Sequence, residues 1–213
     1  MDIYILSDKK VEGAKNLPVF EVKFIKQDID FSKFDALIFT SKNGLYSVDS
    51  FNDEWKNIPS FAIAPQTAKI VEQLGGSLQF TGITNHGNEF ALELLEPLKN
   101  KKVLYLRGSK VVSKLVEILN NNGINCEEAI VYETVCKKIL ENTILPKGST
   151  IIFSSPSTIK CFLENLSWDD SYKAISIGKT TANYFPSNIV PIISDTTSLN
   201  SCVAKALEIN REV

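Results

Sequence analysis

Two stretches of this chain, 114 residues apart, share one pattern of apolar and hydroxylated residues. Phe39 in "FTSKNGL" and Phe153 in "FSSPSTI" have this spacing, and so do Ile63 in "IAPQTA" and Ile177 in "IGKTTA" (153 − 39 and 177 − 63). Two matched junctions at one offset indicate an internal repeat. "IYILSDKKVEG" likewise resembles "LYLRGSKVVSK", so the repeated unit covers roughly 1–98 and again 101–213.

Short apolar runs alternate with helix-like stretches along the chain. This alternation predicts an α/β fold with parallel sheets. The predicted strands are Ile3–Leu6, Leu37–Thr40, Phe61–Ala64, Leu78–Phe80, Val103–Leu106, Ile130–Tyr132, Ile151–Phe153, Ala174–Ile177 and Val190–Ile193.

The repeated unit is not expected to be the folding unit. The run Ile3–Leu6 has no strand close to it in sequence, whereas residues 37–106 supply four strands with helices between them. We therefore predict a discontinuous domain of residues 1–19 plus 136–213 and an inserted domain of residues 24–131. The chain crosses between them at 20–23 and 132–135, and two extended crossings can pair as a β ribbon that acts as a hinge.

Charge and composition exclude several classes of protein. With 44% hydrophobic and 23% charged residues the chain has ordinary globular usage, and its formal net charge of −2 gives no general attraction to nucleic acid or an anionic membrane. No apolar run approaches a membrane span, and "MDIYILSDKK" lacks a signal-peptide pattern, so we expect a cytoplasmic protein. The four cysteines lack metal-type spacing and are expected to be structural filler, and His86 a loop residue without a role.

Hydroxylated residues gather where four predicted strands run into helices. Ligands of open parallel sheets bind at this edge, where helix N-termini offer free amides and a positive dipole end. Helix capping accounts for about half of these hydroxyls, and the remainder favour a site for carboxylates or phosphates. The residues concerned are Thr40, Ser41, Thr67, Ser154, Ser155, Ser157, Thr180 and Thr181.

Recognised catalytic and nucleotide-binding motifs are absent from the sequence. There is no G-x-x-x-x-G-K-[ST], no G-x-G-x-x-G and no Ser-His-Asp set. Tyr132, at the second crossing, could donate a proton, although packing is the commoner use of a strand tyrosine. Arg107, Lys42, Lys173 and Lys179 could pair with carboxylates, although each alone is more often a solvated cation.

The motifs "LIFTSKNGL", "FAIAPQTA", "VLYLRG", "AIVYET", "IIFSSPSTI" and "AISIGKTTA", in this order, resemble the uroporphyrinogen-III synthase (HemD) family over essentially the whole chain. The resemblance implies two flavodoxin-like domains joined by a two-stranded ribbon, with the active site in the interdomain cleft. It implies a cyclising hydro-lyase that converts hydroxymethylbilane to uroporphyrinogen III, inverting ring D through a spiro intermediate, in tetrapyrrole and haem biosynthesis. Neither a metal nor an organic cofactor is implied.

The resemblance also implies roles for individual residues. Tyr132 matches the family tyrosine that assists departure of the substrate hydroxyl, while Ser155, Thr67 and Thr181 match its polar cleft residues. The substrate-binding candidates are therefore Thr40, Ser41, Lys42, Asn43, Thr67, Arg107, Ser154, Ser155, Ser157, Lys173, Lys179, Thr180 and Thr181.

The sequence departs from the family just after the first strand. Many members have an arginine and a proline there, whereas this chain has Ser7, Asp8, Lys9 and Lys10, so a lysine is the candidate replacement. The expected partners are the substrate and, transiently, the preceding pathway enzyme, with no nucleic acid or membrane, and a monomer is expected.

Two other functions stay open at this point. One is a cytosolic two-domain protein that binds or senses a small anion without catalysis, which a Tyr132 pointing away from the cleft would favour. The other is an NAD- or flavin-dependent enzyme, which only the α/β pattern supports.

Overall fold

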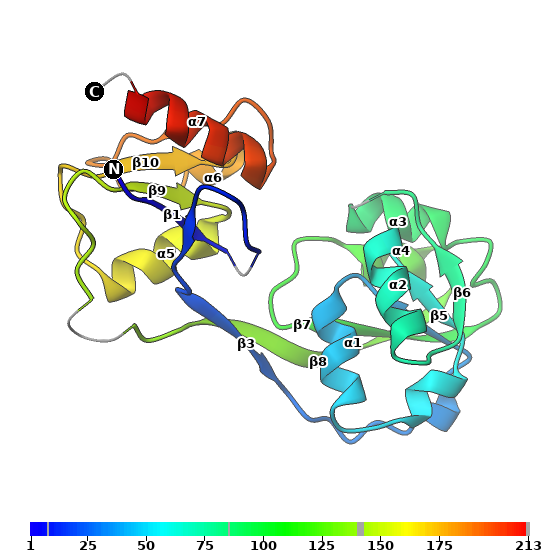
Figure 1. Ribbon diagram of the computed structural model, residues 1–213. Coiled ribbons are helices and arrows are strands. Elements are labelled where there is room, and N and C mark those ends of the chain that lie inside the picture. Colours follow the sequence, from blue (N-terminus) through cyan, green and yellow to red (C-terminus); the bar gives the residue numbers. More distant parts are fainter. Residues whose placement is uncertain (8, 85, 140–142, 212–213) are drawn as a thin grey trace. The chain divides into compact units, whose positions relative to one another are not determined.

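The computed structural model describes residues 1–7, 9–84, 86–139 and 143–211. Contacts within the chain divide it into two compact units (Figure 1). Unit 1 comprises Met1–Glu21 and Val135–Val213, and unit 2 comprises Val22–Thr134. The chain therefore passes between the units twice, once within β3 (Phe20–Phe24) and once within β8 (Asn125–Cys136).

Unit 2 is built on a six-stranded sheet in the order β3-β8-β7-β4-β5-β6. All neighbours from β8 to β6 pair in parallel. Its remaining strands are β4 (Ala36–Phe39), β5 (Ser60–Ala62), β6 (Leu78–Thr81) and β7 (Lys102–Gly108). Its helices are η1 (Phe31–Lys33), α1 (Lys42–Asp49), η2 (Glu54–Asn57), α2 (Pro65–Gln73), α3 (Gly87–Glu93) and α4 (Leu115–Asn121).

Unit 1 is built on a five-stranded parallel sheet in the order β11-β10-β9-β1-β2. Its strands are β1 (Ile3–Leu6), β2 (Lys15–Asn16), β9 (Thr150–Phe153), β10 (Lys173–Ser176) and β11 (Ile192–Ile193). Its helices are α5 (Pro156–Asn165), α6 (Lys179–Ala182) and α7 (Leu199–Arg211). The predicted α/β fold with parallel sheets is confirmed, although the sequence did not reveal the two-residue strand β2.

The repeat in the sequence is also a repeat in strand pairing. Phe39 lies opposite Ala62 in unit 2, and Phe153 lies opposite Ser176 in unit 1, each pair displaced by 114 residues (153 − 39 and 176 − 62). The order β6-β5-β4-β7-β8 therefore corresponds to β11-β10-β9-β1-β2. When the strands are numbered in chain order within each unit, the sheet of unit 1 has the order 2-1-3-4-5, as in flavodoxin. The sheet of unit 2, without its edge strand β3, has the order 3-2-1-4-5. The two sheets are circular permutations of one arrangement.

Alternating side chains of the unit 2 sheet build two cores, one on each face. Ile38 and Tyr105 belong to a cluster with Phe90 of α3 and Leu119 of α4. Leu37, Phe39, Leu104 and Leu106 belong to the opposite cluster, which includes Leu45 and Val48 of α1 and Val71 of α2. Strands covered by helices on both faces carry nearly continuous apolar runs, which is why these runs stood out in the sequence.

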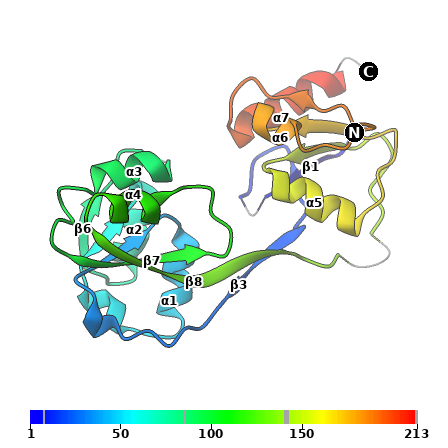
Figure 2. The ribbon, with the colours of Figure 1, turned by 180° about the vertical axis from the view of Figure 1, so that it is seen from behind.

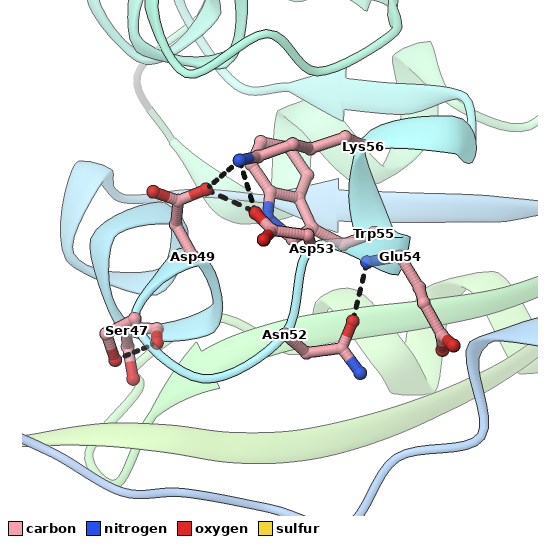
Figure 3. Close-up of polar contacts among 8 residues, drawn as sticks. Ser47, Asp49, Asn52, Asp53, Glu54, Trp55 and Lys56 are labelled. Atoms are coloured by element: carbon pink, nitrogen blue, oxygen red, sulfur yellow. Dashed lines mark hydrogen bonds and ion pairs between the residues drawn. The ribbon is translucent and has the colours of Figure 1, made fainter.

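Trp55, fully buried in the second core, is held by the end of α1. Its indole N–H donates to Asp49 at 3.3 Å, and Lys56 lies between the carboxylates of Asp49 and Asp53 (Figure 3). The ring stands edge-on to Phe39, with centroids 5.7 Å apart. These contacts fix η2 against the strand that leads into α1.

The two chain crossings run side by side as β3 and β8 (Figures 1 and 2). In unit 2 the Ile25 N–H donates to the Val131 carbonyl at 2.7 Å, and in unit 1 the Lys137 N–H donates to the Val19 carbonyl at 2.9 Å. Residue numbers fall along one segment as they rise along the other, so the segments are antiparallel. At 12 residues β8 is much longer than the predicted strand Ile130–Tyr132.

Two of the four cysteines are not simple filler. Cys136, the last residue of β8, forms a disulfide with Cys161 of α5, with Cα atoms 4.9 Å apart. The prediction of structural filler did not include this bond, because the two residues meet only through tertiary structure, 25 positions apart in sequence. Cys126 and Cys202 are buried free thiols. Among the described helices, none is long and apolar enough to cross a membrane.

Candidate functional site

The carboxyl end of β4 presents Thr40 and Ser41 at the start of α1. The Ser41 hydroxyl accepts the Asn43 N–H at 3.2 Å and so caps the helix, while Lys42 and Asn43 form its first turn. The Thr40 hydroxyl lies 2.7 Å from the hydroxyl of Tyr105. Burial raises the pKa of Tyr105, which keeps this phenol protonated. This junction therefore presents neutral donors and the N-terminal end of an eight-residue helix.

The next strand, β5, leads into α2 in a similar way. Ala64 precedes the helix, Pro65 is its first residue, and Thr67 is buried in its first turn. Within the described part of the chain, the Thr67 hydroxyl has no hydrogen-bond partner. Pro65 has no N–H and the Thr67 N–H donates to the Ala64 carbonyl at 3.0 Å. Since Ala64 also has no capping side chain, the Gln66 N–H is the first-turn amide of α2 that is left for an anion.

In unit 1 the strand β9 leads into α5 through consecutive serines. The Ser154 hydroxyl donates to the Leu6 carbonyl at 3.0 Å, which ties β9 to β1. Ser155 precedes the helix, its N–H donates to the Thr158 hydroxyl at 3.3 Å, and its own hydroxyl is 3.2 Å from that of Ser157. Ser155 and Ser157 therefore form one hydroxyl pair, while Ser154 is occupied within the sheet.

The strand β10 leads into the short helix α6. Gly178 precedes the helix, and Lys179, Thr180 and Thr181 are its first three residues. Thr181 is buried, whereas Lys179 and Thr180 are exposed. Lys179 makes no ion pair with any described residue, so its charge is available at the same edge as Ser155.

A hollow of about 530 Å³ lies at this edge of unit 1. Its lining includes Ser7, Lys9 and Lys10 from the segment after β1, and Thr197 and Ser198 from the segment just before α7. Asp8 lies outside the described residues. Neither lysine makes an ion pair with a residue that the structure describes. Two cations without an ion pair among the described residues therefore stand in the segment after β1.

Tyr132 lies in β8, half-buried, at the carboxyl end of the neighbouring strand β7. It borders a hollow of about 90 Å³ that Gly108, Ser109, Lys110 and Thr134 also line. The Ser109 N–H donates to the Tyr132 carbonyl at 2.8 Å. The buried hydroxyl of Ser47 in α1 donates to the carbonyl of Val131, which fixes the strand beside the tyrosine.

Arg107 is already engaged within unit 2. Its Nε and Nη2 donate to the Glu128 carboxylate at 2.9 and 2.6 Å, and its Nη1 donates to the Gly108 carbonyl at 2.8 Å. Glu128 raises the pKa of Arg107, chiefly by this hydrogen bonding. The guanidinium is therefore placed to hold the end of β7 rather than a ligand.

Lys173 lies at the opposite edge of the unit 1 sheet. It begins β10, and its Nζ lies 3.4 Å from the carbonyl of Ile209 in α7. Five of the predicted residues lie together at the carboxyl edge of this sheet: Ser155, Ser157, Lys179, Thr180 and Thr181. Lys173 is separated from them, at the other end of β10. His86 is exposed just before α3.

Sequence reasoning missed several residues that shape these edges: Ser47, Tyr105, Glu128 and Lys110. Tyr105 stands in the motif "VLYLRG", and its position before Arg107 was the only sequence signal for it. Among the described residues, no group of three or more His, Cys, Asp and Glu residues could hold a metal ion. The arrangement offers hydroxyls, helix-start amides, lysines and the phenols of Tyr105 and Tyr132.

Comparisons with known proteins point to one family. The family model "Uroporphyrinogen-III synthase HemD" matches residues 14–204. The uroporphyrinogen-III synthase of Chlorobaculum parvum is 28% identical over 203 residues, covering 84% of this chain and 82% of that protein. The crystal structure of uroporphyrinogen-III synthetase from Helicobacter pylori has a TM-score of 0.83 and 32% identity, over 98% of this chain and 99% of that one. A variant synthase from Thermus thermophilus, at 13% identity and a TM-score of 0.53 over 99% and 98% of the chains, shares the fold.

Proposed function

This chain belongs to the uroporphyrinogen-III synthase family, and from that premise we infer how its residues divide the work of the reaction. The enzyme is a cyclising hydro-lyase of tetrapyrrole biosynthesis that closes hydroxymethylbilane to uroporphyrinogen III. Water is lost and ring D is inverted. The protein must therefore assist departure of the substrate hydroxyl and direct the closure of the ring.

Tyr132 is the residue proposed to assist departure of the substrate hydroxyl. Its phenol lines the small hollow at the end of β7 together with the hydroxyls of Ser109 and Thr134 and the cation Lys110. A phenol is a weak acid, but the pyrrole is electron-rich and expels hydroxide readily to give an azafulvene. A hydrogen bond to the departing oxygen is enough to favour this step.

The substrate's eight carboxylates are proposed to bind at the carboxyl edges of both sheets. In unit 2 the donors are Thr40, Ser41, Lys42, Asn43 and Thr67 with the first turns of α1 and α2. In unit 1 they are Ser155, Ser157, Lys179, Thr180 and Thr181. Lys9 and Lys10 are proposed to take the place of the arginine found in many relatives. The shared cleft that the resemblance implies stays a prediction.

Three of the sequence candidates are left out of this substrate assignment. Arg107 is engaged by Glu128, Ser154 by the Leu6 carbonyl, and Lys173 lies at the opposite sheet edge. Their contacts favour structural roles.

Ring closure is proposed to depend on positioning. Once the azafulvene forms, attack by the substituted carbon of ring D gives a spiro intermediate, whose fragmentation and reclosure invert the ring. Attack by the unsubstituted carbon gives the type I isomer. Holding the carboxylates restricts which carbon approaches, so binding energy selects the product.

The observation that carries the proposed role is the location of Tyr132 beside Gly108, at the carboxyl end of β7. The test supplies hydroxymethylbilane generated in situ, then oxidises the products and separates the porphyrin isomers. The wild-type protein is expected to yield type III, and Tyr132→Phe to lower turnover about 10- to 100-fold with little change in substrate affinity. Unchanged turnover in Tyr132→Phe would remove the proposed role.

The same assay separates catalysis from anion binding alone. A non-catalytic sensor would bind the substrate yet leave only type I, formed at the rate seen without protein. That outcome would contradict the assignment of the activity itself.

A further inference from the structure

The phenol end of Tyr132 occupies the space that a side chain at position 108 would need. A Cβ atom built on Gly108 would lie 2.8 Å from both Cε2 and Cζ of the ring and 3.0 Å from its hydroxyl oxygen. The backbone of Gly108 does not itself demand glycine, because its φ lies outside the left-handed region. Contact with Tyr132 is therefore what restricts this position.

The pairing of β7 with β8 shifts at this point and brings the two residues together. Arg107 lies opposite Ile130, but Gly108 lies opposite Tyr132, so β8 has one extra residue between them. Such a bulge redirects the side chains that follow it. The Ser109 N–H closes the bulge by donating to the Tyr132 carbonyl at 2.8 Å.

Hydrogen bonds from Arg107 hold the Gly108 backbone in place. The Gly108 carbonyl accepts Nη1 of Arg107 at 2.8 Å, and Glu128 anchors the same guanidinium through two further hydrogen bonds. The Arg107 side chain is only 13% exposed. Because these hydrogen bonds hold the backbone, an added methyl group would displace the phenol.

We propose that Gly108 is a positioning residue for the reaction: its lack of a side chain sets where the Tyr132 hydroxyl lies, and the Arg107–Glu128 pair keeps the glycine there. The inference rests on the proposed role of Tyr132. It predicts that substitution at position 108 acts on turnover through the phenol, not through stability or substrate affinity.

The first test measures geometry in the wild-type protein. Nuclear Overhauser effects are recorded between the ring protons of labelled tyrosine and the Gly108 Hα protons, with Tyr132→Phe identifying the signal. A cross-peak is expected, because the ring carbons lie in contact range. Its absence would overturn the proposal whatever the activity of any variant.

The second test is a double-mutant cycle in the porphyrin-isomer assay. Gly108→Ala is expected to lower turnover about 10- to 100-fold while KM changes little, since misplacement of a reacting group is costly. In a Tyr132→Phe background the same change is expected to alter turnover less than about threefold, because no hydroxyl is left to misplace. Full activity of Gly108→Ala, or an equal loss in both backgrounds, would overturn the proposal.

Gly76→Ala provides a matched structural control. A Cβ there would lie 2.7 Å from Cη2 of Trp55, so this variant also forces a methyl group against an aromatic ring of unit 2. It is expected to lower the thermal midpoint but to keep the turnover of the folded fraction. An equal fall in turnover for Gly76→Ala would show a general effect of strain and contradict a specific role for Gly108. If the single variant Tyr132→Phe kept full turnover, the proposed role of Tyr132 itself would be wrong. That result differs from one in which Tyr132→Phe loses turnover and Gly108→Ala does not, which would contradict the role of Gly108 alone.

Discussion

Arg107 on β7 and Glu128 on β8 form a two-point ion pair, with Nε 2.9 Å from Oε2 and Nη2 2.6 Å from Oε1. Two parallel hydrogen bonds make this geometry more specific than a single lysine contact. The pair also shows why a conspicuous arginine at a strand end need not bind the ligand. Its partner lies on the neighbouring strand of the same unit.

The first prediction concerns the strength of this pair. Glu128→Gln keeps the shape but removes the charge, so we expect the free energy of unfolding to fall by about 1 kcal/mol. Urea denaturation monitored by circular dichroism measures the change. Glu127→Gln is the control, because its exposed pair with Lys102 has a single contact at 3.0 Å and should contribute less. Equal losses in the two variants would contradict the special geometry.

A second prediction distinguishes two lysines of unit 1. Lys179→Ala removes an available cation beside Thr180 and Thr181, so KM for hydroxymethylbilane is expected to rise about 3- to 10-fold at low salt. Lys173→Ala removes a cation at the other sheet edge, where its Nζ lies near the Ile209 carbonyl. Steady-state kinetics should show a much smaller change in KM for Lys173→Ala. A larger rise in KM for Lys173→Ala than for Lys179→Ala would contradict substrate binding at the carboxyl edge of the unit 1 sheet.

The third prediction concerns the hydroxyl of Thr67, a largely buried residue in the first turn of α2. Thr67→Val keeps the volume and removes the donor, and a lost hydrogen bond of about 1 kcal/mol corresponds to a KM several-fold higher. Thr67→Ser retains the hydroxyl and should recover most of the affinity. If valine and serine behaved alike in the kinetic assay, the effect would come from packing rather than from hydrogen bonding.

Thiol reactivity gives a prediction about pH. Burial, aided by the charges of Glu128 and Glu127, raises the pKa of Cys126 from 9.0 to about 12. At pH 9 half of an ordinary thiol of this kind is thiolate, but the native Cys126 should be almost entirely protonated and resist iodoacetamide. Burial also raises the pKa of Cys202. Mass spectrometry should therefore find both thiols unmodified in the native protein and alkylated in urea.

The disulfide gives the fifth prediction. Cys136 and Cys161 enclose a loop set by their separation of 25 residues, which corresponds to about 3 kcal/mol of stabilisation in the chain-entropy model. Reduction should lower the thermal midpoint, and the variant Cys136→Ser should show the lower midpoint without reductant. Four alkylated cysteines in urea before any reduction would show that the bond is absent.

The local features of the fold followed from the sequence, because short-range patterns determine them. Apolar runs such as Ile151–Phe153 marked buried strands, and the offset between Phe39 and Phe153 located equivalent strand ends. Ser41 and Ser155 were recognisable at helix starts because capping depends on residues only a few positions apart.

Only the tertiary structure decided which of these side chains are engaged within the protein and which are left to bind a ligand. Arg107 meets Glu128, Gly108 lies against Tyr132, and Cys136 reaches Cys161 across gaps of 21, 24 and 25 positions (128 − 107, 132 − 108 and 161 − 136). Such contacts depend on strand register, here on one bulge between β7 and β8, and a shift of one residue would point every following side chain to the other face. The sequence by itself therefore determined the main buried strands, the repeat and the kind of chemistry. The pairing of strands decided that Arg107 supports the site and that a glycine sets the place of the tyrosine.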